Sequence, residues 1–105
     1  MEELDSCLAE LRYLYKYIRF ADRANYVKYG SKTLFSCLVK VGLNLMYANK
    51  NGLSLSTKQI KTLKKYKITI IKMVSSENEK VQRRCLTNKL IDTMLGILLS
   101  VLPDV

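Results

Sequence analysis

The chain has 105 residues, 49% of them hydrophobic and 26% charged, and its formal net charge is +9. This length corresponds to one domain, and the apolar content excludes a disordered basic tail. The chain has no histidine and only four scattered glycines, so it lacks the commonest general base and any glycine-rich phosphate loop. We therefore expect a single domain over residues 1–105 that is not an enzyme.

The positive charge is concentrated in the middle of the chain. Residues 11–89 hold all 18 Lys and Arg against three acidic residues, and no acidic residue lies between Asp22 and Glu77. Residues 1–10 and 90–105 contain acidic residues and no basic ones. A field this uneven attracts polyanions such as DNA, RNA or an anionic membrane surface.

The scarcity of glycine and proline favours helices over a turn-rich β fold. We expect an all-α, compact bundle of about five helices that self-associates. Its first element is an acidic amphipathic helix over residues 3–20, where apolar residues recur at spacings of three and four. Asp22 is the predicted N-cap of a short second helix, which Gly30 ends.

The basic centre of the domain, residues 23–89, contains the next helices. Ser31 is the predicted cap of a helix that reaches Ala48, and Gly42 within it permits close approach of a neighbouring helix. A loop over residues 49–52 follows, because Asn, Lys and Gly are clustered there.

The following helix has the clearest start signal in the chain. Ser56 and Gln59 have the spacing of a capping box, and Leu55 can pack on Ile60 as a hydrophobic staple. The apolar spacing predicts that this helix ends near Val74.

Ser76 and Glu79 have the spacing of a second capping box, for a helix that contains Val81 and Leu86. The segment over residues 90–102 is apolar on nearly every side and too short to span a bilayer. Burial in a core or a subunit interface is expected, with insertion into a membrane surface as the alternative. The predicted interface residues are Leu90, Ile91, Met94, Leu95, Ile97, Leu98, Leu99, Val101 and Leu102.

The three cysteines, Cys7, Cys37 and Cys85, lie far apart in the sequence. Zinc sites need paired spacings, usually with histidine, so we expect neither a metal nor a cofactor. We interpret all three as reduced, mostly buried thiols of an intracellular protein. The acidic N-terminus predicts no secretory signal.

A set of lysines on the helix that begins at Ser56 is the strongest functional signal. Lysine is a flexible point charge, suited to phosphates and poor at bidentate base contacts. Lysines can also simply solvate a helix face, but the absence of acids from the whole central region favours binding of nucleic-acid backbone. The predicted contacts are Lys58, Lys61, Lys64, Lys65, Lys67, Lys72, Arg83 and Arg84.

Five tyrosines present a second question. Tyr13, Tyr15 and Tyr17 alternate, so on a helix they cannot share one face. Together with Tyr26 and Tyr29 they could stack on unpaired bases. Such tyrosines also commonly border a core with the hydroxyl in water, and both interpretations stay open.

From Ser31 the chain reads S-K-T-L-F-S-C-L-V-K-V-G-L-N-L-M, then an Asn/Lys/Gly loop, L-S-x-x-Q-x-x-x-L-K-K-Y-K, a basic linker and a hydrophobic C-terminus. Over residues 31–102 this resembles the small basic proteins encoded beside capsid genes in Polinton/Maverick elements and adintovirus-like DNA viruses. The matching positions are Cys37, Asn44, Leu55, Ser56, Gln59, Leu63, Tyr66 and Lys67. The chain departs from the pattern at residues 77–79, where the family is lysine-rich, and at residues 87–88, where it tends to have a Gly-Gly pair.

The resemblance implies a virion-associated or DNA-packaging protein, with a capsid protein as a possible partner and the virion and host nucleus as its locations. Without that implication we expect an intracellular protein, nuclear or cytoplasmic, that is not secreted. The expected function is non-specific binding of DNA or RNA backbone. The rivals are a protein-interaction module, such as an inner capsid or host-factor adaptor, and a membrane-active virion protein using the C-terminal segment.

Overall fold

The computed structural model describes residues 7–30, 32–48 and 54–101, which form helices and short connections without a strand among them. The prediction of an all-α bundle is confirmed, and this part of the chain has six α-helices where about five were expected; self-association stays a prediction. The elements are α2 (Leu8–Tyr17), the 3-10 helix η1 (Phe20–Asp22), α3 (Arg23–Tyr29), α4 (Lys32–Met46), α5 (Thr57–Ser75), α6 (Glu79–Cys85) and α7 (Asn88–Val101).

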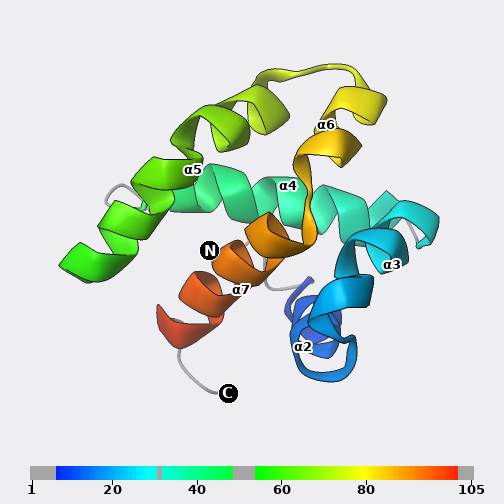
Figure 1. Ribbon diagram of the computed structural model, residues 1–105, viewed down its shortest axis with the longest axis horizontal. Coiled ribbons are helices and arrows are strands. Elements are labelled where there is room, and N and C mark those ends of the chain that lie inside the picture. The colour runs from blue at the N-terminus through cyan, green and yellow to red at the C-terminus, as the bar shows by residue number, and fades with distance from the viewer. Residues whose placement is uncertain (1–6, 31, 49–53, 102–105) are drawn as a thin grey trace.

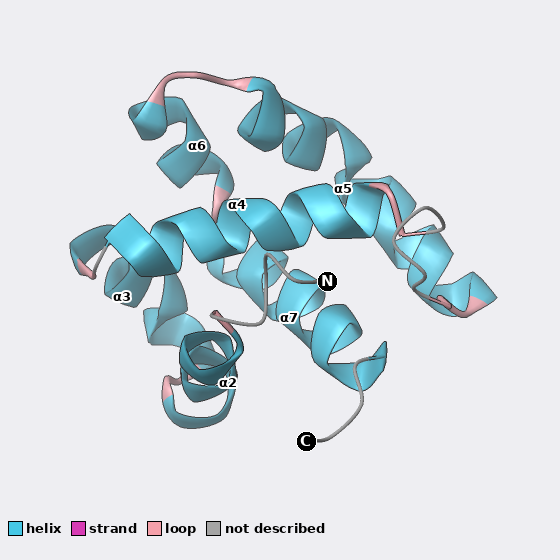
Figure 2. Cartoon of the chain, turned by 180° about the vertical axis from the view of Figure 1, so that it is seen from behind, coloured by secondary structure: helices cyan, strands magenta, loops and turns pink. Residues whose placement is uncertain are grey.

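Helix α4 crosses the middle of the molecule (Figure 1). Helices α5 and α6 lie on one side of it and α2 on the other, which the view from behind also shows (Figure 2). Helix α7 packs against both α2 and α4, while α3 closes the end of the bundle where α4 begins. The two central helices are therefore α4 and α7.

Burial is very unequal among the helices. Eight residues of α4 and six of α7 are buried, whereas α5, the longest helix, buries only Ile70 and Met73. A helix that is apolar on nearly every side is stable only when it is surrounded, and α7 satisfies this within a single chain. Each buried leucine or isoleucine contributes about 1.5 to 3 kcal/mol relative to an exposed one.

The burial of α7 corrects the interface prediction. Six of its nine proposed interface residues lie in the core of the chain itself, so their side chains leave no surface for a second subunit: Leu90, Ile91, Met94, Leu95, Ile97 and Leu98. Leu99 and Val101 are partly exposed, and Leu102 lies outside the described residues.

Gly42 lies where α4 and α5 pack closely. A Cβ atom at this position would lie 2.7 Å from Cε of Met73 and 3.4 Å from Cγ2 of Ile70. These are the two buried residues of α5, so the absence of a side chain lets α5 dock closely. The predicted role of Gly42 in helix approach is confirmed.

The first helix ends earlier than predicted, at Tyr17 instead of residue 20. The reason is Arg23, whose guanidinium donates to the carbonyl oxygens of Tyr15 (2.8 Å) and Ile18 (3.1 Å). These bonds satisfy carbonyls that the end of α2 leaves without helical partners. Arg23 is only 7% exposed and also pairs with Asp92 of α7 (2.6 Å), so it joins α2, α3 and α7.

Three of the predicted caps can be compared with the structure. The capping box at Ser56 is confirmed, because its hydroxyl accepts from Gln59 N (3.1 Å) and its own N–H donates to Gln59 Oε1 (2.9 Å). Asp22 makes no cap bond at α3 and instead pairs with Arg19 (2.9 Å). Gly30 follows the last residue of α3, as predicted.

The second predicted capping box, Ser76 with Glu79, is wrong. Asn78 is the N-cap of α6, and its side chain accepts from Lys80 N at 2.9 Å. The hydroxyl of Ser76 accepts from Asn78 N at 3.1 Å and so shapes the turn instead. An asparagine directly before the helix is as good a cap as serine. The predicted cap at residue 31 and the loop at 49–52 lie outside the described residues.

The cysteine prediction is wrong for two of the three residues. Cys7 and Cys37 form a disulfide with a Cα–Cα distance of 5.8 Å, while Cys85 is a free, buried thiol. The two cysteines are far apart in the sequence, so their pairing could not be predicted from spacing. They meet because the start of α2 packs on the middle of α4. Disulfides are typical of oxidising compartments, so the cysteines give no reason to expect an intracellular protein.

Candidate nucleic-acid interface

The face of α5 turned away from α4 carries four lysines, Lys58, Lys61, Lys65 and Lys72, which we call the lysine face. Their spacings of three, four and seven residues place them in a row along the helix. All four are exposed. The capping box holds the start of this helix and the buried residues near its end hold it to the core, so the lysines project from a fixed rod.

No acidic side chain neutralises this face within the described residues. The ion pairs among the described residues are Arg19–Asp22, Arg23–Asp92 and Arg83–Glu79, and none of them involves a residue of α5. Exposed helices usually mix charges of both signs. The lysine face therefore presents net positive charge to solvent, with the exposed side chain of Ile68 (83%) among the lysines.

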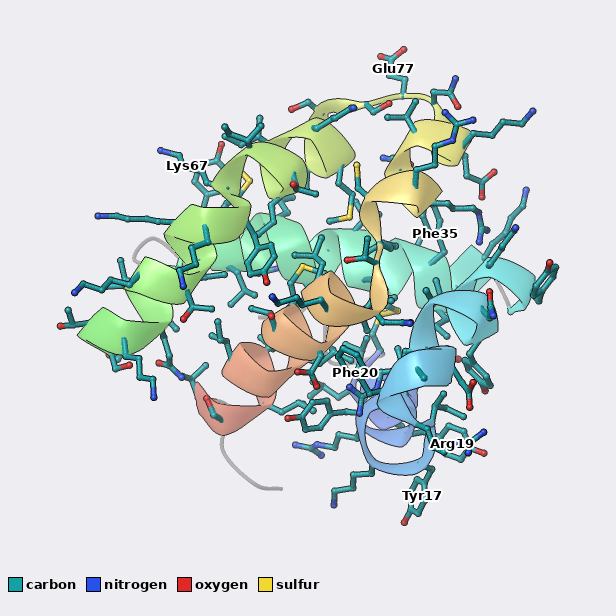
Figure 3. The ribbon with its side chains drawn as sticks, viewed as in Figure 1. Tyr17, Arg19, Phe20, Phe35, Lys67 and Glu77 are labelled. Carbon is teal, nitrogen blue, oxygen red and sulfur yellow. A yellow bond between two sulfur atoms is a disulfide. The ribbon has the colours of Figure 1, made fainter. Side chains whose placement is uncertain are left out.

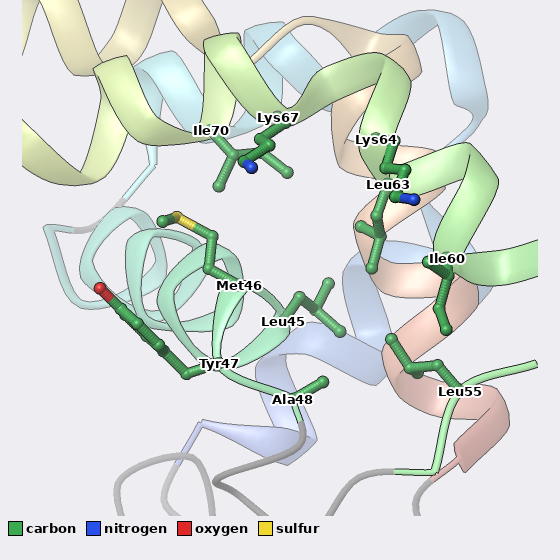
Figure 4. Close-up of a pocket in the computed structure, with 10 residues that line it drawn as sticks. All are labelled: Leu45, Met46, Tyr47, Ala48, Leu55, Ile60, Leu63, Lys64, Lys67 and Ile70. Atoms are coloured by element: carbon green, nitrogen blue, oxygen red, sulfur yellow. The ribbon is translucent and has the colours of Figure 1, made fainter.

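Lys64 and Lys67 belong to a different surface. Both line a pocket of about 390 Å³ between α5 and the end of α4, with an otherwise largely apolar wall that includes Leu45, Leu63 and Ile70 (Figure 4). Both are exposed, and the pocket lies on the flank of α5. Of the six lysines of α5 predicted to contact nucleic acid, these two thus lie beside the pocket and the other four form the lysine face.

Arg84 continues the lysine face onto the next helix. It is exposed, and it lines a hollow of about 320 Å³ between α5 and α6 together with Lys72. Lys72 and Arg84 belong to different helices, and the turn between α5 and α6 brings them to one hollow. The basic surface therefore runs from the start of α5 to α6.

Arg83 has a different environment from its neighbour. Its guanidinium lies 4.4 Å from the ring centroid of Phe35, donates to the Val27 carbonyl (3.1 Å) and pairs with Glu79 (3.0 Å). The side chain is 22% exposed. Its main contacts are inside the protein, so Arg83 joins α6 to α3 and α4.

The tyrosines divide as their alternation predicts. Tyr13 and Tyr17 are one turn apart, with ring centroids 5.3 Å from each other, and Tyr26 of α3 lies 6.4 Å from Tyr13. Tyr15 faces the other way, beneath the guanidinium of Arg23 at 5.0 Å. In Figure 3, Tyr17 and Arg19 point outward at the end of the molecule opposite Lys67.

A second basic region, which the sequence did not reveal, lies between α3 and α6. A hollow of about 540 Å³ is lined by Lys28 and Lys80 as well as Arg83 and Arg84. Lys28 and Lys80 are distant in the chain, and neither belongs to a lysine-rich helix, so no local pattern marks them. Only the packing of α6 beside α3 brings them together.

No known protein family, curated protein or solved structure matches this chain. Within residues 7–30, 32–48 and 54–101, no three Cys, Asp or Glu side chains are grouped as a metal site. No helix in these ranges is both long enough and apolar enough to cross a membrane.

Proposed function

We propose that this protein binds nucleic-acid backbone without sequence preference, through the lysine face of α5 and Arg84. One observation supports the proposal above all. Four exposed lysines lie in a row on one helix, and no carboxylate of the described residues pairs with them.

The chemistry of the face fits phosphates better than bases. A lysine ammonium acts as a point charge, whereas base edges are read mainly by planar, bidentate groups. Each phosphate that a lysine neutralises adds about 0.9 to the salt slope of duplex binding. Contacts of this kind position a protein on the backbone and carry no sequence information.

The proposal includes the process in which this binding takes place. The resemblance of residues 31–102 to proteins encoded beside capsid genes supports a role in packaging a viral or virus-like genome, with the virion and host nucleus as locations and a capsid protein as a possible partner. Self-association would multiply weak phosphate contacts.

The second candidate function is that of a protein-interaction module, which would use the pocket between α4 and α5 instead of the apolar residues of α7. The apolar residues of α7 are largely buried, but the pocket beside Lys64 and Lys67 is open to solvent and mostly apolar. A partner segment with apolar and acidic side chains would match it.

Two triple variants of equal net charge test the proposal. Lys58→Ala/Lys61→Ala/Lys65→Ala removes three charges from the lysine face, and Lys16→Ala/Lys32→Ala/Lys89→Ala removes three exposed lysines from three other helices. Duplex-DNA affinity is measured by fluorescence anisotropy over a range of salt. We expect the first variant to lower the salt slope by about 2 to 3 and the second to lower it by less than about 1.

Two results would overturn the proposal. Duplex affinity that is negligible near about 50 mM salt, where phosphate contacts are strong, would show that the protein is not a backbone binder. Equal losses in the two variants would show that net charge acts without a defined site.

A further inference from the structure

Helix α3 separates two hollows of complementary chemistry. On one side is the basic hollow between α3 and α6, and on the other a hollow of about 370 Å³ bordered by Tyr17 and Tyr26. Asn25 lines both of them. Charge and aromatic rings are therefore adjacent across a single short helix.

The aromatic side presents ring surface to solvent. Tyr13 is 49% exposed, Tyr17 71% and Tyr26 41%, and the ring planes of Tyr17 and Tyr26 are tilted by 37° and 39° from that of Tyr13. The one acidic residue lining this hollow, Asp22, is paired with Arg19. These rings form a stepped aromatic surface beside the hollow.

The basic side is lined by three cations with exposed side chains, Lys28, Lys80 and Arg84, the last of which also lines the hollow between α5 and α6. Glu79, the acidic residue directly before Lys80 in the sequence, is paired with Arg83. Asn25 and Thr87 add neutral hydrogen-bonding groups to the wall. An anion entering this hollow meets positive charge from two helices.

We propose that the surface around α3 binds single-stranded nucleic acid, with phosphates in the basic hollow and unpaired bases stacked on Tyr17 and Tyr26. A groove of positive charge beside exposed aromatic rings is the combination by which proteins hold single strands. This surface shares Arg84 with the proposed duplex site but none of the lysines of the lysine face, so the inference does not depend on duplex binding by α5.

The rings select single strands over duplexes for a geometric reason. In a duplex the faces of the bases are already stacked on one another, and only their edges are accessible. A tyrosine ring can stack only on a base whose face is free. An acidic peptide would satisfy the lysines but has no need of the aromatic rings.

The test compares an oligothymidylate of about 12 nucleotides, within the range that single-strand binders cover, with a duplex of the same length. Tyr17→Ala and Tyr26→Ala are each expected to weaken oligothymidylate binding about tenfold and to leave duplex binding unchanged. Tyr17→Phe and Tyr26→Phe keep the ring and should bind as the parent does. Tyr47→Ala is the control, because Tyr47 is similarly exposed and directly follows the last residue of α4 (Figure 4).

A charge variant, Lys28→Ala/Lys80→Ala, is expected to lower the salt slope for oligothymidylate by about 1.4, at about 0.7 per contact. The inference is overturned if the tyrosine variants lose nothing, if they lose duplex and single-strand affinity equally, or if Tyr47→Ala has the same effect. The triple variant of the lysine face distinguishes the two proposals. Its failure to affect duplex binding refutes the role of α5 and leaves the result at α3 unaffected.

Discussion

Helices α5 and α7 are the two most different parts of this molecule. Helix α7 has 14 residues and buries six of them, whereas α5 has 19 residues and buries two. Helix α7 contacts α2, α3, α4 and α5, whereas α5 lies along one side of α4 (Figure 1) and its lysine face is exposed. Within one small domain, α7 therefore contributes buried apolar side chains to the core, and α5 contributes exposed positive charge.

This division has a physical basis. A charged side chain in the core costs several kcal/mol unless it is paired, and the buried cation Arg23 is indeed paired and hydrogen-bonded. Placing the lysines on a peripheral helix avoids that cost. This arrangement predicts that substitutions in α7 lower the free energy of unfolding, whereas substitutions on the lysine face of α5 lower the affinity for nucleic acid.

The largest effect is expected in α7. Leu95 is fully buried, and Leu95→Ala should lower the free energy of unfolding by about 3 to 5 kcal/mol through lost burial and the cavity that remains. Chemical denaturation followed by circular dichroism measures the change. The matched control is Ile68→Ala in α5, where an 83% exposed side chain should cost less than about 0.5 kcal/mol. Comparable costs at the two sites would break the comparison.

The disulfide should rank next. Cys7 and Cys37 are 30 positions apart, and replacing both by serine should lower the free energy of unfolding by about 3 to 4 kcal/mol, because the unfolded chain regains the entropy of an open loop. Cys85→Ala should cost less than about 1.5 kcal/mol. Thiol titration of the unreduced, denatured protein should find one reactive group per chain; three would mean that the disulfide is absent.

A smaller effect distinguishes the adjacent arginines. Arg83→Ala should cost about 1.5 to 2 kcal/mol of stability, because it removes a charge-assisted hydrogen bond and the contact with Phe35. Arg84→Ala should leave the unfolding midpoint unchanged and weaken duplex binding a few-fold. The reverse assignment of these effects would contradict the division between core and charged surface.

Local signals in the sequence predicted much of this structure. The capping box at Ser56 and the amphipathic period of α5 each depend on residues within a few turns of one another, and both are observed. The lysine face follows from the same period. The glycine at position 42 indicated a close helix approach, although the neighbour it contacts lies on α5. A helix that is apolar on every side was likewise recognised as buried, although its role as the core of one chain required the other helices.

The features that the sequence concealed depend on contacts between distant segments. The pairing of Cys7 with Cys37 requires α2 to lie on α4, and the burial of Arg23 requires carbonyls from the end of α2 and a carboxylate from α7. Arg83 and Arg84 are neighbours in the chain and both line the hollow at α3, but only Arg84 also lines the hollow between α5 and α6. The hollow at α3 combines residues of two helices, and no spacing rule connects them.

The most direct test of the division between the lysine face and the core is charge reversal on α5, in Lys58→Glu/Lys61→Glu/Lys65→Glu. Glutamate favours helices, and at position 58, in the first turn of α5, it suits the positive end of the helix dipole, so we expect the urea unfolding midpoint to be unchanged. Duplex-DNA affinity at about 50 mM salt should fall at least about 100-fold. Retained affinity, or binding lost only together with unfolding, would contradict this account.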